Sequence, residues 1–268
     1  SCWLAFCYTT RDTIFSTYQS NLATSHMLPS FITVRSSSTR LPNKCYKSFG
    51  EATVIEHIIK RALHYGLDPI VCTTNEREDN RIVDIALSNN VKVFQGSAIN
   101  KLQRWRDCCR QFEVTAFHSV DADDLFFCGD EVRRSFALLK EGYDIVEPSP
   151  SSSNGGATVG YSLKYDIVDK ACQNLNPNTD TEMMWSYINR VPRLQRTILP
   201  DPESSVINHR MTLDYPEDYI LLEAIRLMVG NLATRKDVHK ALNNNPGLAK
   251  INAFRSAEWL NNQLSKSL

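Results

Sequence analysis

Two hydrophobic patterns alternate along the first half of the chain. Short apolar runs, which are typical of buried strands, lie at 30–35, 69–73, 91–94, 115–120 and 144–146. Between them, apolar residues recur at every third or fourth position, which predicts helices at 52–65, 80–88, 99–112 and 131–140. Strands that alternate with helices at this short spacing indicate an α/β protein with a parallel sheet and right-handed crossovers.

The second half of the chain departs from this rhythm. Residues 147–156 have the Pro, Ser and Gly content of a loop, and we expect a small inserted subdomain at about 147–205. Within it, the pattern predicts a strand at 161–163 and helices at 165–175 and 180–189. After it, we predict a strand at 206–213 and then helices at 216–228, 235–243 and 249–263.

The first 26 residues stand apart from this pattern. Their apolar start is short and has no basic leader, which makes it a poor signal peptide. The tripeptide Ser25-His26-Met27 is typical of the scar that a cloning site leaves before a start methionine. We therefore expect 1–26 to be a non-native N-terminal extension and 27–268 to form a single domain.

Composition narrows the class of protein. Among 268 residues, 30 Lys and Arg balance 30 Asp and Glu, which argues against a nucleic-acid partner. Hydrophobic residues make up 42%, enough for a sizeable core, and no apolar run reaches the length of a membrane span. The eight cysteines form no CxxC pair, so we expect reduced thiols in a cytoplasmic protein.

The balanced charge hides a local excess of cations after the first predicted strand. No acidic residue occurs from Thr13 to Gly50, whereas four cations fall within thirteen positions: Arg35, Arg40, Lys44 and Lys47. They share this loop with four consecutive hydroxyl residues, 36–39. Such a loop at the end of a first parallel strand can bind phosphate groups through backbone N–H groups and fixed cations. A solvated basic loop is the alternative.

Carboxylates follow at two later positions. Asp121, Asp123 and Asp124 come directly after the predicted strand 115–120, and Asp214 precedes a helix that begins with Pro216. Carboxylates at a strand end suit Mg²⁺, which also bridges to substrate phosphates. Helix capping or a solvated turn is the competing interpretation of both sites. Together with the cationic loop they would form a site for nucleotidyl transfer.

Several motifs resemble one known family. The run 31–44 (FITVRSSSTRLPNK) resembles the N-terminal signature of the cytidylyltransferases that make CMP-activated sugars, in particular the CMP-KDO synthetase and spore-coat polysaccharide groups. Their pattern is a strand followed by A-R-x-x-S-T-R-L-P-G-K. The resemblance continues in 94–97 (FQGS), 102–105 (LQRW) and 210–219 (RMTLDYPEDY), over roughly 31–225.

The resemblance implies a fold, an activity and a set of site residues. The fold would be a three-layer Rossmann-like nucleotide-diphospho-sugar transferase fold, and the enzyme would be a magnesium-dependent cytidylyltransferase. It would transfer CMP from CTP to a small acidic acceptor, such as the 2-keto-3-deoxy acid KDO, and release pyrophosphate in cell-surface polysaccharide synthesis. Relatives dimerise through the inserted region, so a homodimer is implied, with no nucleic-acid or membrane partner.

The implied roles fall on matching positions. The catalytic residues would be Arg35, Lys44, Asp121 and Asp214, of which Asp121 and Asp214 would bind Mg²⁺. The nucleotide would contact Arg35, Ser38, Arg40, Lys44, Thr73, Thr74, Gly96 and Ser97. Glu182 and Arg210 are candidates for substrate contact, and the other cations considered for an acidic acceptor are Lys164, Arg190 and Arg193.

The chain also departs from the family pattern. Family Ala, Gly, Gly and Asp are replaced here by Val34, Asn43, Val120 and Thr74. Two rival interpretations therefore stay open. In a GT-A type glycosyltransferase, Asp121-Ala122-Asp123 would be the DxD motif that holds a metal on a nucleotide-sugar. In a non-catalytic relative, the same site would bind nucleotide without turnover.

Overall fold

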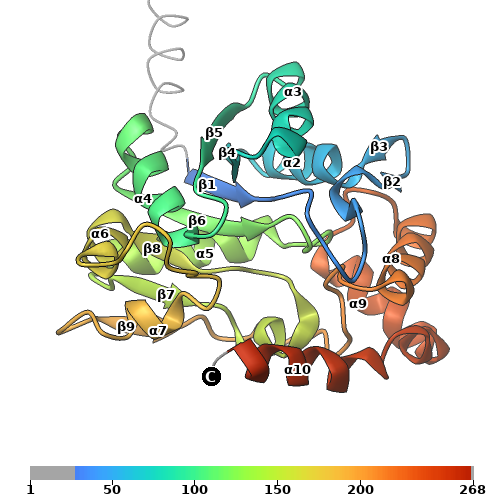
Figure 1. Ribbon diagram of the computed structural model, residues 1–268. Helices are drawn as coiled ribbons and strands as arrows, with labels where there is room; N and C mark the ends of the chain where they lie inside the picture. Colours follow the sequence, from blue (N-terminus) through green and yellow to red (C-terminus); the bar gives the residue numbers. More distant parts are fainter. Residues whose placement is uncertain (1–27, 267–268) are drawn as a thin grey trace, which may run out of the picture.

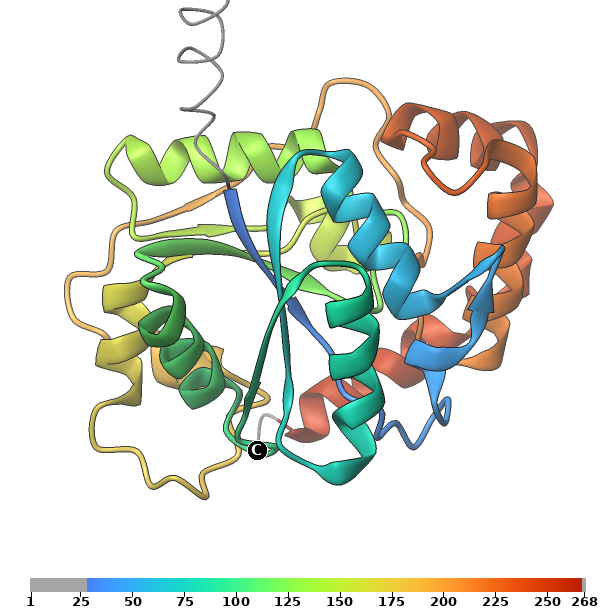
Figure 2. The same ribbon diagram turned by 90° about the horizontal axis from the view of Figure 1, so that it is seen from above.

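The computed structural model describes residues 28–266, which include a seven-stranded sheet covered by helices on both faces (Figures 1 and 2). Its strands are β1 (Leu28–Thr33), β4 (Leu67–Thr74), β5 (Lys92–Gly96), β6 (Ala116–Asp121), β7 (Ile145–Glu147), β8 (Ser162–Lys164) and β9 (Arg196–Ile198). Their order in the sheet is β5-β4-β1-β6-β8-β7-β9. A separate hairpin consists of β2 (Ser48–Phe49) and β3 (Ala52–Thr53).

Helices cover both faces of the sheet, and further helices pack beside it. They are α2 (Val54–His64), α3 (Asn80–Ser88), α4 (Lys101–Phe112), α5 (Gly129–Lys140), α6 (Tyr165–Cys172), α7 (Trp185–Ile188), α8 (Pro216–Val229), α9 (Arg235–Asn244) and α10 (Arg255–Lys266). Helices α2, α3 and α5 share one apolar cluster with the sheet, and α4, α6 and α7 share another. The predicted α/β class with a Rossmann-like sheet is thereby confirmed.

Strand β1 shows why the sheet is buried on both faces. Its neighbours are β4 and β6, both parallel to it. Successive side chains of a strand point to opposite faces. Accordingly Phe31 belongs to the cluster under α4 and Ile32 to the cluster under α2, and neither is exposed. A central strand of a parallel sheet is therefore a continuous apolar run, as the sequence shows.

Helix starts follow local chemistry. Thr53 caps α2: its hydroxyl accepts from the backbone of Glu56, and the Glu56 carboxylate accepts from the backbone of Thr53 at 2.7 Å. Asp218 caps α8, because its carboxylate accepts from the backbone N–H groups of Asp214 and Tyr215, each at 2.9 Å. Asp214 itself is thus not the cap, and its side chain is left for other partners.

The prediction of a strand at 206–213 is wrong. This segment forms no ladder; its backbone N–H groups bond singly, from Met211 to Gly155 and from Leu213 to Asp123. Its alternating apolar residues are nevertheless buried, in a third apolar cluster that includes residues of α8 and α9. An extended segment with one buried face has the same hydrophobic period as a strand, so the pattern could not separate the two.

The sheet is not wholly parallel, which corrects a second expectation. Strand β8 runs antiparallel to both β6 and β7. The structure also adds β9 and the β2–β3 hairpin, which the pattern did not predict. Because β8 and β9 join the central sheet, residues 147–205 do not build a sheet of their own. The proposed domain limits stay a prediction, and the extension 1–26 lies outside the described residues.

Two features of the described part bear on expectations from composition. None of its helices is long and apolar enough to cross a membrane. The six cysteines within residues 28–266 are free and buried.

Candidate active site

A large open cavity of about 1030 Å³ lies at the carboxyl ends of β1 and β6. Part of its wall comes from the segment 34–47 between β1 and β2, called here the β1 loop, and from residues 121–124. The rest comes from Lys101, 148–161, 182–185, 212–214 and Trp259. In the strand order β5-β4-β1-β6, the chain passes from β1 outward to β4 and β5 and then crosses to β6 on the other side of β1. Ligands of α/β proteins bind at this type of switch point.

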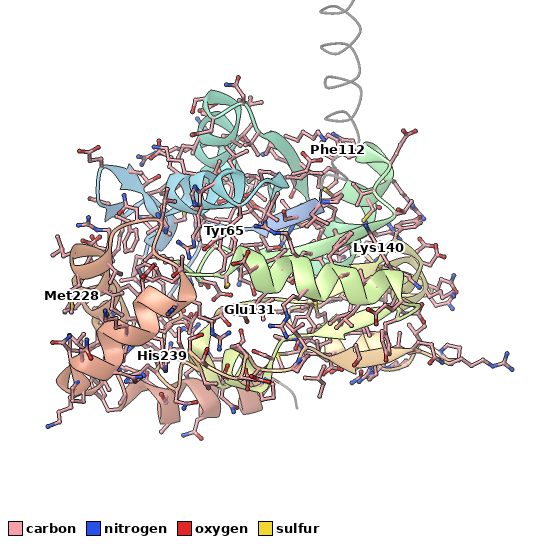
Figure 3. All side chains as sticks on the ribbon, turned by 180° about the vertical axis from the view of Figure 1, so that it is seen from behind. Tyr65, Phe112, Glu131, Lys140, Met228 and His239 are labelled. Carbon is pink, nitrogen blue, oxygen red and sulfur yellow. The ribbon has the colours of Figure 1, made fainter. Side chains whose placement is uncertain are left out.

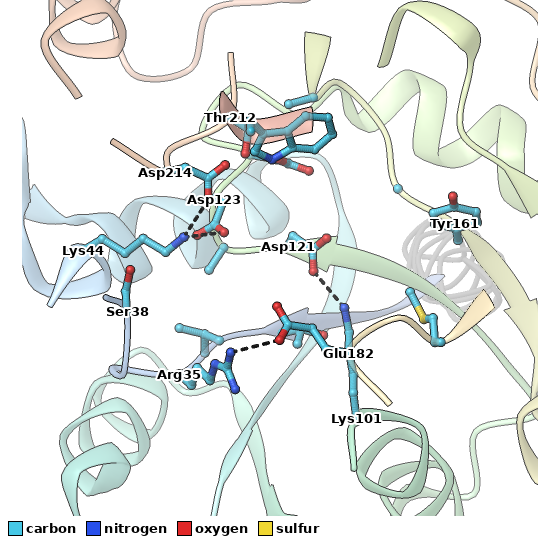
Figure 4. A pocket seen from close by; sticks show the side chains of 18 of the residues that line it. Arg35, Ser38, Lys44, Lys101, Asp121, Asp123, Tyr161, Glu182, Thr212 and Asp214 are labelled. Carbon is cyan, nitrogen blue, oxygen red and sulfur yellow. Dashed lines mark hydrogen bonds and ion pairs between the residues drawn. The ribbon is translucent and has the colours of Figure 1, made fainter. Parts of the chain in front are cut away.

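Lys44 is held between two carboxylates of the cavity (Figure 4). Its Nζ lies 2.6 Å from Asp123 Oδ2 and 3.4 Å from Asp214 Oδ1, and it donates to the carbonyl of Leu213 at 3.0 Å. Burial lowers the pKa of Lys44, but the two carboxylates outweigh it and the net pKa is raised. Burial raises the pKa of Asp123 to about 6, against the opposing effect of Lys44.

Asp214 accepts from cations on both of its oxygens. Arg40 lies 2.6 Å from Oδ1, which Lys44 also approaches, and Arg210 lies 2.9 Å from Oδ2. Burial raises the pKa of Asp214, but the three cations outweigh burial, so the net pKa is lowered. Arg210 is buried and also bonds Asp218, so it supports the 210–218 segment and does not line the cavity.

Asp121 lines the same cavity but lies outside the ion pairs that Lys44 and Arg40 form with Asp123 and Asp214. It ends β6, half of its side chain is exposed, and its Oδ1 is 3.4 Å from Nζ of Lys101. Val120, the residue before it, is buried in the core cluster under α2 and does not line the cavity. The valine at this position therefore does not narrow the cavity in this structure.

Residues of the region 147–205 close the far wall. Glu182 reaches across the cavity to Arg35, with a separation of 3.6 Å (Figure 4). The rings of Tyr161 and Trp185 stack with centroids 3.8 Å apart, and both line the cavity. The acceptor candidate Glu182 is therefore at the site, opposite the loop that carries Arg35.

A second cavity of about 470 Å³ continues from the first and shares Arg35 and Ser38 with it. Thr74 and Asp79 line it. Asp79 accepts from the backbone N–H of Ser36 at 2.8 Å and from the Thr74 hydroxyl at 2.5 Å. Burial raises the pKa of Asp79, but these hydrogen bonds outweigh it, so its net pKa is lowered. The carboxylate thereby fixes the β1 loop to β4.

The remaining predicted nucleotide residues are placed differently. Thr73 is fully buried and its hydroxyl bonds Asp79 at 3.2 Å. Gly96 and Ser97 do not line either cavity; Ser97 accepts from the backbone of Asn100 and from Arg104 at the start of α4. Ser38 lies at the cavity and accepts from the backbone of Leu41. Of the eight predicted nucleotide residues, Thr73, Gly96 and Ser97 therefore line neither cavity.

Asn43 explains one departure from the family pattern. Its φ is 53°, in the left-handed region that glycine adopts most easily. Asparagine is the residue that tolerates this region next best. The position therefore keeps the turn before Lys44 although the glycine is absent.

The carboxylates fit a metal ion only in part. Among the described residues, no three His, Cys, Asp or Glu side chains come together as a metal site would need. Asp121 has an accessible carboxylate, whereas both oxygens of Asp214 are taken by cations. Mg²⁺ is commonly held by one or two carboxylates plus substrate phosphates. Asp121 fits this mode, and Asp214 would fit it after releasing Lys44 and Arg40.

Sequence reasoning missed Lys101, Asp79 and Trp259. Lys101 lies between the FQGS and LQRW motifs but belongs to no phosphate-binding signature. Its closeness to these two motifs was the signal in the sequence that could have identified it. Asp79 lies in a short helical turn, 77–79, that the pattern did not predict. Trp259 belongs to α10, far along the chain, and reaches the cavity only through folding.

The sheet and the charged cavity define the class: α/β proteins with a Rossmann-like sheet and a ligand site at the carboxyl ends of its central strands. Residues 31–139 match the family model described as cytidylyltransferase. This segment, which includes Arg35 to Lys44 and Asp121, is therefore similar to cytidylyltransferases, the family that the motifs resemble. The match of this segment supports cytidylyltransferase as the class of enzyme.

Three individual proteins are similar to this chain over most of its length. An uncharacterised protein of Methanocaldococcus jannaschii is 26% identical over 198 residues, 71% of this chain and 79% of its own length. A cytidylyltransferase structure from Leptospira borgpetersenii has a TM-score of 0.73 at 20% identity, covering 84% of this chain and 97% of that one. CMP:2-keto-3-deoxy-manno-octonic acid synthetase in complex with CTP has a TM-score of 0.57 at 13% identity, covering 75% and 98%. At these identities the two structures establish the fold alone.

Proposed function

We propose that this protein transfers CMP from CTP to a small acidic acceptor, such as a 2-keto-3-deoxy sugar acid, and releases pyrophosphate. The observation that carries the proposal is the convergence of the cationic β1 loop with Asp121, Asp123 and Asp214 in one cavity. The family match of residues 31–139 supports the same reaction. Magnesium dependence and a homodimer are parts of the proposal that rest on the resemblance of the motifs.

The reaction requires positioning more than covalent chemistry. An oxygen of the acceptor would attack the α-phosphorus of CTP, the bond from that phosphorus to the β-phosphate oxygen would break, and pyrophosphate would leave with the electron pair. The acceptor hydroxyl would lose its proton to solvent. Arg35, Arg40 and Lys44 would neutralise the phosphates, and Asp121 would hold Mg²⁺, whose charge further stabilises the leaving group.

Ion pairs in the cavity fit this assignment. Lys44 and Arg40 now face Asp123 and Asp214, so an arriving triphosphate would exchange one set of anionic partners for another. The glycosyltransferase alternative needs Asp123 as a metal ligand of a DxD motif. Asp123 is 2.6 Å from Lys44, so that alternative would require this ion pair to open first.

The test is a pyrophosphate-release assay with CTP, Mg²⁺ and a panel of acidic sugars that includes KDO. We expect release with CTP in preference to ATP, GTP and UTP. Replacing Asp121→Asn should lower kcat/KM by about a hundredfold, because a lost charge-assisted contact in the transition state has this magnitude.

The matched control is Asp84→Asn on the exposed face of α3, which should keep wild-type activity. Full activity of the Asp121→Asn protein would refute the role of Asp121. CTP binding without pyrophosphate release from any acceptor would identify the chain as the non-catalytic nucleotide-binding relative.

A further inference from the structure

We propose that Lys101 binds the negatively charged group of the acceptor, and that the acceptor half of the cavity is the part between Lys101, Tyr161 and Trp185. This inference rests on the proposed function for the identity of the reaction. The class of ligand follows from the site itself: a small molecule that presents a carboxylate to Lys101 and a ring face to two aromatic side chains.

The position of Lys101 is electrostatically unfavourable for a structural lysine. It is the first residue of α4, where the helix dipole favours anions and disfavours cations. Its side chain is only 17% exposed, and its Nζ lies 4.8 Å from the centroid of the Trp105 ring. Trp105 is fully buried and is fixed by a 3.0 Å hydrogen bond to Thr33 of β1. Contact with the Trp105 ring therefore holds Lys101 in the wall of the cavity, where its side chain is still partly exposed to solvent.

The ion pair of Lys101 is the one that substrate binding would release. Its partner Asp121 is the accessible carboxylate that fits a metal ion. A cation that binds Asp121 would displace Lys101, which would then need another anion within reach. An acidic acceptor beside the α-phosphate supplies one.

The other cations of the cavity come from a different part of the chain. Within the described residues that line it, these are Arg35, Arg40 and Lys44, all from the β1 loop. Arg40 and Lys44 contact Asp214, and Arg35 faces Glu182. Figure 4 shows Lys101 rising from α4 between Glu182 and Tyr161, beneath Asp121. The lysine thus adds a positive charge from α4 to the side of the cavity where Glu182 and Tyr161 lie.

The cations considered from sequence for this role are placed elsewhere. Lys164 pairs with Asp144 at 3.1 Å, Arg210 is buried in the 210–218 segment, and Arg190 stacks over Tyr187. These three residues and Arg193 do not line the cavity. The wall they were expected to charge instead carries the stacked rings of Tyr161 and Trp185. Aromatic faces of this kind suit the apolar face of a ring, while Lys101 suits its carboxylate.

The experiment compares Lys101→Met, Lys101→Arg and the wild type with KDO and its methyl ester as probes. Pyrophosphate release gives KM and kcat, and calorimetry gives the binding of each probe, with the protein alone and with a non-cleavable CTP analogue and Mg²⁺. The control is Lys60→Met, an exposed lysine of α2 on the other face of the sheet.

In the Lys101→Met protein we expect KM for KDO to rise about ten- to a hundredfold, while KM for CTP changes less than about twofold. Lys101→Arg should restore part of the affinity, and the methyl ester should bind equally to wild type and Lys101→Met. An unchanged KM for KDO, or an equal rise for KDO and CTP, would overturn the assignment.

The two proposals fail in different ways. If no acceptor supports pyrophosphate release, the proposed function is wrong, and calorimetry decides the role of Lys101. Binding of KDO by the wild type that is lost in Lys101→Met would uphold the assignment without the reaction. No binding of KDO by the wild type would overturn it.

Discussion

Single residues of the site owe their properties to near neighbours. Asp214 and Asp123 are both acidic side chains in one cavity, yet their pKa values move apart. Burial raises both, but Asp214 also faces Arg40, Lys44 and Arg210, whereas Asp123 faces Lys44. The number of cations around each carboxylate therefore decides the direction in which its pKa moves.

His118 shows the same principle in the core. It is fully buried in β6, its Nε2 accepts from the backbone N–H of Gly160, and its Nδ1 lies 2.8 Å from the Ser162 hydroxyl. Nδ1 must therefore carry the proton and donate it. Gly160 lines the cavity and lies against Ser119, where a Cβ would meet the carbonyl oxygen at 2.0 Å. A neutral His118 thus positions one wall of the site.

This arrangement predicts a pH dependence of stability. Burial lowers the pKa of His118 to about 3, so the unfolded chain binds the proton first as the pH falls below about 6.5. The stabilising contribution is complete above pH 6.5 and is lost progressively on acidification. We expect a loss of about 2 kcal/mol in the free energy of unfolding between pH 6.5 and 5 from this group.

Urea unfolding at pH 6.5 and pH 5 measures this loss. His118→Asn should be less stable at pH 6.5 but lose less stability on acidification, whereas His64→Asn, at an exposed position of α2, should keep the wild-type slope. Equal slopes in His118→Asn and wild type would contradict the prediction.

At the scale of elements, the loop before β8 is held from the far side of the molecule. Glu131 of α5, seen from behind in Figure 3, forms a buried ion pair with Arg235 of α9. Arg235 also donates to the hydroxyls of Ser151 and Thr158, each at 2.9 Å. These contacts join α5 and α9 to the 151–158 segment, which contributes several residues to the cavity.

Removal of this cation should therefore be costly. Arg235→Met would leave Glu131 buried without its counter-ion, and we expect the free energy of unfolding to fall by about 3–5 kcal/mol. Chemical denaturation is the measurement. Lys236→Met, the exposed neighbour on α9, should change the stability by less than about 0.5 kcal/mol. A small effect of Arg235→Met would show that water or another group compensates Glu131.

At the scale of the whole molecule, the cavity lies where three apolar clusters meet. Val159 of its lining belongs to the cluster under α2, Met184 to the cluster under α4, and Ala157 to the cluster with α8. Ligands that fill the cavity would consequently contact parts of all three clusters. A ligand that binds only the folded state stabilises a protein by mass action.

We therefore expect CTP with Mg²⁺ to raise the melting temperature. At a concentration of about 100 times Kd the gain is about 2.7 kcal/mol, or a shift in Tm of about 5–10 °C for a chain of this size. Differential scanning calorimetry with CTP and with ATP measures the shift and its base preference. A shift as large for ATP as for CTP would argue against a cytidine-specific site.

Much of this organisation was predictable from local pattern. The β1 loop, Asp121 and the alternation of strands and helices each lie within a short stretch of sequence, so periodicity and composition indicated them. The same reasoning failed at 206–213, because burial on one face gives a period of two whether or not a ladder forms.

The sequence by itself determined the α/β class, the strand after which the cations gather and the residues that carry the family motifs. Tertiary structure alone decided which charges face one another. It brought Asp214 to Arg40 across 174 residues, Lys101 to Asp121 and Arg235 to Glu131. Electrostatic partners are set by distance in space, and hydrophobic burial, which fixes the packing of distant elements, sets that distance.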